Sequence, residues 1–187
     1  RSSDLELAQQ SGRALSVASA EDPARGSETA TGGFAAFLPD PGNQLALAAC
    51  RRVVEAPGLE HNPLYLHGPP GCGKSHLLGA IAATFRETAG DAGVLAMSGD
   101  AFVAQFAHRL NQDNDAAARA AVDDAAVIII DGIDALADRA LAQEELFRLI
   151  NDALEQGRQL VFAGNDAPRR LTGLTDRLAT RLSWGLA

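Results

Sequence analysis

Eight consecutive residues have the composition of a loop that binds phosphate groups. They run from Gly68 to Ser75 in the order glycine, four residues, glycine, lysine, serine. Glycines let successive main-chain N–H groups point at phosphate oxygens, and the N-terminus of a following helix adds a positive end. Lys74 can neutralise the β- and γ-phosphates, and the Ser75 hydroxyl can ligate Mg²⁺. The pattern therefore predicts a site for ATP or ADP with Mg²⁺.

The alternative for this stretch is a glycine-rich turn with a surface lysine. An apolar strand at residues 64–66 before the loop and a helix starting near Lys74 after it favour the phosphate site, because the motif needs that context. We interpret Cys72 as a small spacer in preference to a reactive thiol. The loop residues that we expect to contact the nucleotide are Gly68, Gly71, Cys72, Gly73, Lys74 and Ser75.

A second acidic site is expected at the end of another strand. Residues 127–130 are β-branched throughout, which is typical of a strand buried on both faces, and Asp131 follows them directly. The Asp131 carboxylate can hold Mg²⁺ through water beside Ser75. An ordinary strand-end aspartate is the alternative, and the presence of the phosphate loop favours the metal role.

Four apolar segments predict the strands that position these residues. They lie at residues 64–66, 94–97, 127–130 and 160–163. Segments with helical spacing separate them, including one that Asn43 can cap and that carries Leu45, Ala49 and Val53 on one face. This alternation predicts an α/β fold, a three-layer P-loop NTPase with a parallel sheet flanked by helices.

The predicted nucleotide-binding domain comprises residues 34–187. Residues 1–33 are rich in Ser, Ala, Gly and Glu, and we interpret them as a linker or tail, with a short docking helix near Leu5 as the alternative. Because the chain begins at Arg1, we expect it to be part of a longer protein. No apolar run reaches the length of a membrane span, which excludes a membrane role for the sequence as given.

The negative net charge argues against a protein that functions mainly by binding the phosphates of nucleic acids. The chain has 187 residues and a formal net charge of -8, from 24 acidic and 16 basic side chains. Its two cysteines, Cys50 and Cys72, lie far apart and form no C-x-x-C pair. We therefore expect a reduced cytoplasmic protein without a disulfide framework or a zinc ribbon.

Several segments beyond the phosphate loop carry a family resemblance. They are residues 34–37, 43–49, 62–68, 73–78, 143–147 and 176–186. Together they resemble the ATPase domain of the bacterial replication initiator DnaA, in order and over about residues 34–187. They are also similar to the DnaA-like regulator Hda and, more distantly, to helicase loaders of the DnaC and IstB type. All of these are AAA+ proteins.

The resemblance implies roles for residues outside the loop. The segment from Phe37 to Asn43 matches the part that frames the adenine, and His76 fits the family pattern, with a packed histidine as the alternative. Asp166 matches the sensor 1 aspartate. Arg181 matches the arginine finger that reaches the γ-phosphate of a neighbouring subunit, which implies self-association. We expect Trp184 to be a core or sheet-edge aromatic.

Three features depart from the family pattern. Gly132 stands where AAA+ ATPases carry a second acid that orients the attacking water, and Asp134 is the nearest acid that could substitute. The segment 111–124 has four acids and one arginine, so DNA contact through it is doubtful. The chain stops at Ala187, so the helical lid of the family is missing from it.

Three functions remain open at this point. The favoured one is a nucleotide-gated module for assembly or partner docking in DNA replication initiation or its regulation, with slow or absent hydrolysis because of Gly132. An active ATPase of the helicase-loader or transposition-helper type is the second. A non-enzymatic interaction domain that retains the fold is the third, and the intact phosphate loop argues against it. The sequence does not identify the protein partner.

Overall fold

The computed structural model describes residues 33–107 and 116–186, and this part of the chain contains a four-stranded parallel sheet. The strands lie in the order β1-β4-β3-β2, and all three neighbouring pairs are parallel. Their bounds are Leu64–His67 for β1, Val94–Ser98 for β2, Val127–Asp131 for β3 and Gln159–Gly164 for β4. Each predicted strand is confirmed to within about one residue at either end, the usual precision of such boundaries.

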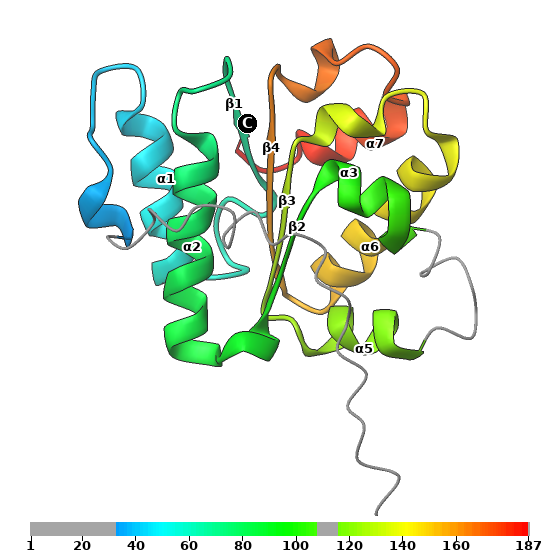
Figure 1. Ribbon diagram of the computed structural model, residues 1–187, viewed down its shortest axis with the longest axis horizontal. Coiled ribbons are helices and arrows are strands. Elements are labelled where there is room, and N and C mark those ends of the chain that lie inside the picture. Colours follow the sequence, from blue (N-terminus) through cyan, green and yellow to red (C-terminus); the bar gives the residue numbers. More distant parts are fainter. Residues whose placement is uncertain (1–32, 108–115, 187) are drawn as a thin grey trace, which may run out of the picture.

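Helices cover both faces of the sheet (Figure 1). The longer ones are α1 Gln44–Glu55, α2 Lys74–Ala89, α5 Ala116–Asp124, α6 Ala140–Glu155 and α7 Asp176–Leu182. The short ones are α3 Gly99–Ala101, the π-helical η3 Phe102–Phe106 and the 3-10 helices η1 Gly33–Ala36, η2 Asp91–Gly93, η4 Ile133–Leu136 and η5 Pro168–Arg170. The α/β prediction of a parallel sheet between helical layers is confirmed.

Two apolar cores lie on opposite faces of the sheet, and β3 contributes to both. Val127 and Ile129 pack with α1 and α2, whereas Ile128 and Ile130 pack with α6 and α7 on the other face. All four side chains are at most 1% exposed. This burial on both faces explains why the strand is apolar at every position and does not alternate with polar residues.

The pairing register brings the carboxyl ends of three strands to one edge. His67 at the end of β1 pairs with Gly164 at the end of β4, and Asp131 at the end of β3 pairs with Ala163. Residues that follow these strands therefore start from the same edge of the sheet. Open parallel sheets bind their ligands at this edge.

Some local expectations were wrong. Leu45 is 73% exposed, and α1 buries Leu47 and Cys50 together with the expected Ala49 and Val53. Asn43 precedes α1, but its side chain makes no capping hydrogen bond. Trp184 is 66% exposed and is therefore not a core aromatic.

Other expectations concern the ends of the chain and its relation to membranes. Residues 1–32 of the proposed tail and residues 111–115 of the segment 111–124 lie outside the described residues. Near the other end, Leu186 forms an isolated parallel bridge with Leu64, beside β1. In residues 33–107 and 116–186, no helix combines the length and apolar character that crossing a membrane requires.

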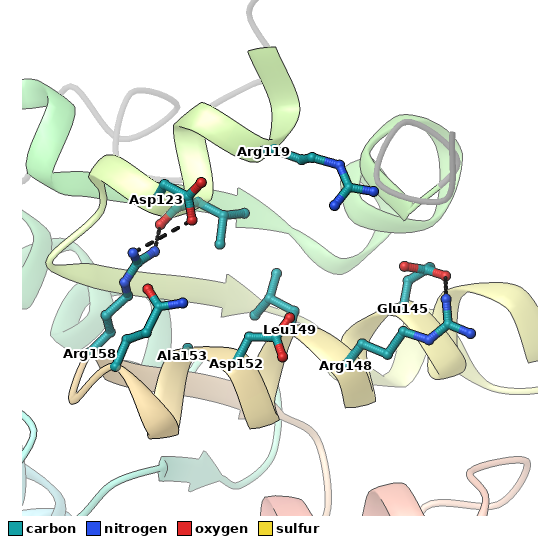
Figure 2. Close-up of a pocket in the computed structure, with 10 residues that line it drawn as sticks. Arg119, Asp123, Glu145, Arg148, Leu149, Asp152, Ala153 and Arg158 are labelled. Carbon is teal, nitrogen blue, oxygen red and sulfur yellow. Dashed lines mark hydrogen bonds and ion pairs between the residues drawn. The ribbon is translucent and has the colours of Figure 1, made fainter. Parts of the chain in front are cut away.

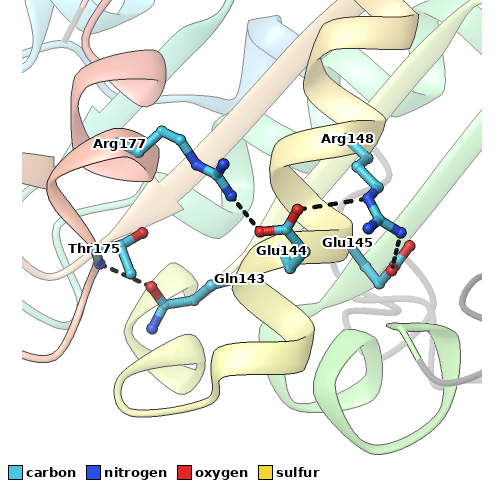
Figure 3. Close-up of polar contacts among 6 residues, drawn as sticks. All are labelled: Gln143, Glu144, Glu145, Arg148, Thr175 and Arg177. Atoms are coloured by element: carbon cyan, nitrogen blue, oxygen red, sulfur yellow. Dashed lines mark hydrogen bonds and ion pairs between the residues drawn. The ribbon is translucent and has the colours of Figure 1, made fainter.

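A buried amide connects the segment before α7 to the rest of the molecule (Figure 3). The Gln143 side chain in α6 is 3% exposed, and its Nε2 donates to the carbonyls of Leu136 and Gly173, at 2.8 and 2.7 Å. Its Oε1 accepts a hydrogen bond of 2.8 Å from the main-chain N–H of Thr175. One side chain thus satisfies three main-chain groups from η4 and from the turn that leads to α7.

Replacing Gln143 with alanine should destabilise the domain by about 1–3 kcal/mol, because the Thr175 N–H loses its partner and the carbonyls of Leu136 and Gly173 each keep only one hydrogen bond. Urea unfolding measures this as a lower transition midpoint with an unchanged slope. Gln156→Ala removes an exposed amide just beyond α6 and serves as the control, with an expected change within about 0.5 kcal/mol. Equal midpoints for the two variants would show that the Gln143 contacts contribute no net stability.

Candidate functional site

The predicted phosphate loop joins β1 to α2 at the sheet edge described above. Its three glycines, Gly68, Gly71 and Gly73, have φ of 154, 81 and 96°. Side chains other than glycine rarely adopt this left-handed range, so the loop depends on glycine at these positions. Gly73 is the residue just before α2, and therefore the first N–H groups of that helix face the loop.

The Lys74 ammonium lies over the loop. Its Nζ donates to the carbonyl oxygens of Gly68 and Pro69, at 2.6 and 3.1 Å, and lies 3.9 Å from the Cys72 Sγ. Two carbonyls of the loop thus hold the positive charge of Lys74 in place. Cys72 is exposed and Cys50 is buried, and neither forms a disulfide.

Ser75 and Asp131 come together as the sequence predicts. The Ser75 Oγ donates to the Asp131 Oδ2 at 2.5 Å, which joins the first turn of α2 to the end of β3. A hydroxyl and a carboxylate oxygen are hard donors that suit Mg²⁺, an ion that keeps several waters and uses few protein ligands. The described residues contain no cluster of three or more His, Cys, Asp or Glu side chains.

Phe37 and His76 pack at the entrance to the loop. Phe37 is 8% exposed, and a Cβ added to Gly73 would come within 2.8 Å of its ring. The ring centroids of Phe37 and His76 are 5.6 Å apart, and the His76 Nε2 lies 3.3 Å from the carbonyl oxygen of Gly33. These contacts attach the segment before α1 to the start of α2, and a contact between His76 and the nucleotide stays a prediction.

The Asn43 side chain shapes the turn that precedes α1. Its Oδ1 accepts from the main-chain N–H of Asp40 at 2.7 Å, and its Nδ2 donates to the carbonyl of Leu38 and to the Asp40 carboxylate. Asn and Asp favour such local bonds with the main chain, which compete with helix capping. These hydrogen bonds of Asn43 thus organise the segment 38–43.

Asp166 follows β4 at the same sheet edge. Its Oδ1 accepts from the main-chain N–H of Ala167 at 2.8 Å and lies 2.5 Å from the Arg170 Nη2. Its main-chain carbonyl accepts from the Tyr65 hydroxyl at 3.2 Å. Strand register therefore places Asp166 beside β1 and β3, while its carboxylate is turned to Arg170.

Arg181 lies elsewhere, on α7 and against α6. Its guanidinium donates to the Asn151 Oδ1 and stacks on the Trp184 ring at 3.9 Å from the centroid. One helical turn earlier, Arg177 stacks on Phe147 at 4.1 Å and pairs with Glu144. Trp184 is thus an exposed platform for Arg181. The helix α7, which carries Arg181, packs on the face of the sheet opposite α2 (Figure 1).

Sequence reasoning missed the contacts between the strand ends. The Asp134 carboxylate accepts from the main-chain N–H of Asn165, and Tyr65 reaches the carbonyl of Asp166. The ion pair of Asp166 and Arg170 could have been predicted from their spacing of four residues, which is common for opposite charges. Bonds from Asp134 and Tyr65 to the main chain leave no such pattern, because any residue can supply a main-chain N–H or carbonyl.

A separate pocket lies between α5 and α6 (Figure 2). Its volume is about 420 Å³, and its lining includes Arg119, Asp123, Glu145, Arg148 and Arg158. Arg158 pairs with Asp123 and Arg148 with Glu145, so both signs of charge are present and partly neutralised there. None of the residues predicted to form the functional site lines this pocket.

Relatives share this arrangement over most of the described chain. Residues 29–187 match the bacterial DnaA ATPase domain. The chromosomal replication initiator protein DnaA of Synechocystis sp. is 39% identical over 153 residues, which are 82% of this chain and 34% of that protein. The chain thus spans about a third of the length of this relative.

Solved structures show the same fold. AMPPCP-bound DnaA from Aquifex aeolicus superposes with a TM-score of 0.76 at 25% identity, over 83% of this chain and 48% of that one. The DnaC helicase loader superposes with a TM-score of 0.67 at 17% identity, over 83% and 94% of the two chains, and at this identity only the fold is shared. With its parallel sheet, its phosphate loop and this match, the chain belongs to the family of bacterial DnaA ATPase domains.

Proposed function

We propose that this chain binds ATP or ADP with Mg²⁺ and uses the bound nucleotide to control assembly or partner docking in DNA replication initiation or its regulation. The observation that carries the proposal is the meeting of the Ser75 hydroxyl and the Asp131 carboxylate, 2.5 Å apart, beside the Lys74 ammonium. Charge for the phosphates and oxygen donors for the metal are thus together at one sheet edge.

The loop supplies the phosphate contacts and the adjoining segment the base contacts. Lys74 and the N–H groups around Gly71, Cys72 and Gly73 neutralise the phosphates, while Ser75 and Asp131 hold the metal, which screens the phosphate charge when it is bound. Phe37 lies directly against Gly73, which supports a place for the adenine near the segment 37–43. The DnaA of Aquifex aeolicus binds the ATP analogue AMPPCP, which supports a triphosphate ligand.

Ser75→Ala should lower ATP affinity about tenfold in the presence of Mg²⁺ and leave it nearly unchanged in EDTA, because one metal donor is lost and no phosphate donor. Titration calorimetry under both conditions measures the two affinities. Thr88→Ala removes an exposed hydroxyl from the far end of α2 and serves as the matched control, with wild-type affinities expected. Full enhancement by Mg²⁺ in Ser75→Ala would contradict the metal role.

The proposal includes slow or absent hydrolysis of the bound ATP. A positioned base contributes about 10²–10⁴-fold to a rate, and Gly132 stands where a second acid would supply one. Gly132 has φ of 84°, and its N–H donates to the carbonyl of Ala163 at 2.9 Å. The nearby Asp134 carboxylate is already bonded to the main chain at Asn165.

Gly132→Glu should raise ATP turnover by about 10²-fold if the missing acid limits the rate. A Cβ at this position meets no atom within 4 Å, so the side chain has room, although the left-handed backbone costs about 1–2 kcal/mol. Gly132→Gln is the matched control, because it has the same shape and the same backbone strain but no base. Equal turnover of the Glu and Gln variants, measured by phosphate release, would show that the acid is not what limits hydrolysis.

Assembly is proposed to depend on Arg181. In one chain the guanidinium is held by Asn151 and Trp184, on the side of the sheet away from α2. The match of Arg181 to the arginine finger of the family supports a role on the nucleotide of a neighbouring subunit, where a planar cation stabilises the γ-phosphate. The neighbour is taken to be a second copy of this chain or a related AAA+ domain.

Arg181→Ala should abolish ATP-dependent oligomers or raise the concentration they need at least about tenfold, as the loss of a central interface arginine does. Sedimentation velocity with ATP and with ADP measures the assembly. Arg169→Ala removes another exposed arginine, on η5, and should assemble as the wild type does. Persistence of the oligomers in Arg181→Ala would refute its interface role.

The second candidate is an ATPase motor of the helicase-loader or transposition-helper type, which the fold shared with the DnaC loader favours. This candidate differs from the first because it requires rapid ATP hydrolysis, which a substitution of Lys74 should abolish. Contact with DNA is not part of either proposal, because the described helix α5 carries Arg119 beside Asp123 and Asp124 and offers no aromatic side chain for stacking.

A further inference from the structure

We propose that Asp134 is a positioning residue, whose carboxylate holds the turn at Asn165 and Asp166 in place beside the Ser75–Asp131 pair and so sets the preference for ATP over ADP. The proposal rests on the proposed function, because it assigns a role within the same nucleotide site. In this role Asp134 does not substitute for the acid that is missing at Gly132.

The path of the chain after β3 brings Asp134 over the end of β4. Gly132 turns the chain in a left-handed conformation, and its N–H donates to the carbonyl of Ala163. The single turn η4 then follows, and the carboxylate of Asp134 points back to the sheet edge. The main-chain N–H of Asn165 is shared between the Asp134 Oδ1 and Oδ2, at 3.2 and 3.0 Å.

Tyr65 of β1 holds the same turn from the other side. Its side chain is 1% exposed, and its hydroxyl donates to the carbonyl of Asp166 at 3.2 Å. Burial first, and then the charges of Asp134 and Asp166, raise the pKa of Tyr65 well above its usual range, so the phenol keeps its proton and remains a donor. One hydrogen bond from β1 and one to η4 thus fix two successive residues of the turn.

Gly164 shows how tightly these groups converge. A Cβ added there would lie 2.1 Å from the Tyr65 hydroxyl oxygen and 3.4 Å from the Asp134 Oδ2. The phenol and the carboxylate therefore both pack over the last residue of β4, and no larger residue fits beneath them. Gly132 and Asp134 lie one and three residues after Asp131. The turn at Asn165 and Asp166 is therefore bonded to the segment that follows the proposed metal ligand.

This arrangement predicts what the loss of Asp134 does. The family resemblance implies that Asp166 acts on the γ-phosphate, and to do so its carboxylate must leave Arg170. The turn that carries Asp166 is held by the Tyr65 hydroxyl and by the Asp134 carboxylate. Without it, Asn165 loses its partner, and Asp166 is no longer held at a fixed distance from the γ-phosphate position. Contacts to the phosphate loop itself are unaffected, so ATP affinity should fall while ADP affinity changes little.

Two substitutions at this residue separate the possible roles. In Asp134→Asn an amide carbonyl can still accept from Asn165, whereas Asp134→Ala has no acceptor. Competition titrations of the full chain with a fluorescent ATP analogue give the ratio of the ADP to the ATP dissociation constant. We expect Asn to keep this ratio within about threefold of the wild type and Ala to lower it about tenfold, the effect of one lost hydrogen bond. Asp152→Ala, on the exposed side of α6, is the carboxylate control and should keep the wild-type ratio.

Several results would overturn the inference. An unchanged ratio in Asp134→Ala, or an equal loss of ATP and ADP affinity with a lower melting temperature, would show that the residue does not position the turn for the nucleotide. Turnover that falls as far in Asp134→Asn as in Asp134→Ala would identify Asp134 as the base. If the wild-type chain binds neither nucleotide, the proposed function itself fails, and this inference fails with it.

Discussion

The parallel register of β1, β4 and β3 is the constraint on which the candidate site depends. It aligns His67 with Gly164 and Asp131 with Ala163, so a loop, a carboxylate and a turn that are remote in sequence leave the sheet at one edge. The strands are apolar because helices cover both faces. Polar side chains of these segments consequently gather where the strands end, and the geometry of the site is a consequence of sheet packing.

The polar and charged side chains that we assign to the nucleotide and to a neighbouring subunit all have partners within the chain. Lys74 is bonded to two carbonyls of its own loop, Ser75 to Asp131, and Arg181 to Asn151 and Trp184. Each of these contacts satisfies a donor without burying an unpaired charge. In the proposed function, the nucleotide and the neighbouring subunit replace these bonds, and the net affinity is the difference between the two sets. By this exchange the proposed switch lets a bound nucleotide alter contacts elsewhere in the chain.

Sequence patterns predicted the fold and the centre of the site because both depend on short-range chemistry. Strand composition and the phosphate-loop motif led to β1 to β4 and to the pairing of Ser75 with Asp131. They failed where a side chain bonds to the main chain of a distant segment, as Gln143, Asp134 and Tyr65 do. They also failed for Leu45 and Trp184, since an apolar residue is not obliged to be buried.

A crystal structure of the chain with a non-hydrolysable ATP analogue and Mg²⁺ tests the central claim most directly. The account predicts that the Lys74 ammonium moves from the carbonyls of Gly68 and Pro69 to the phosphates, and that the metal lies beside Ser75 and Asp131. A structure in which Lys74 keeps both carbonyl bonds and the analogue lies away from the loop would contradict it.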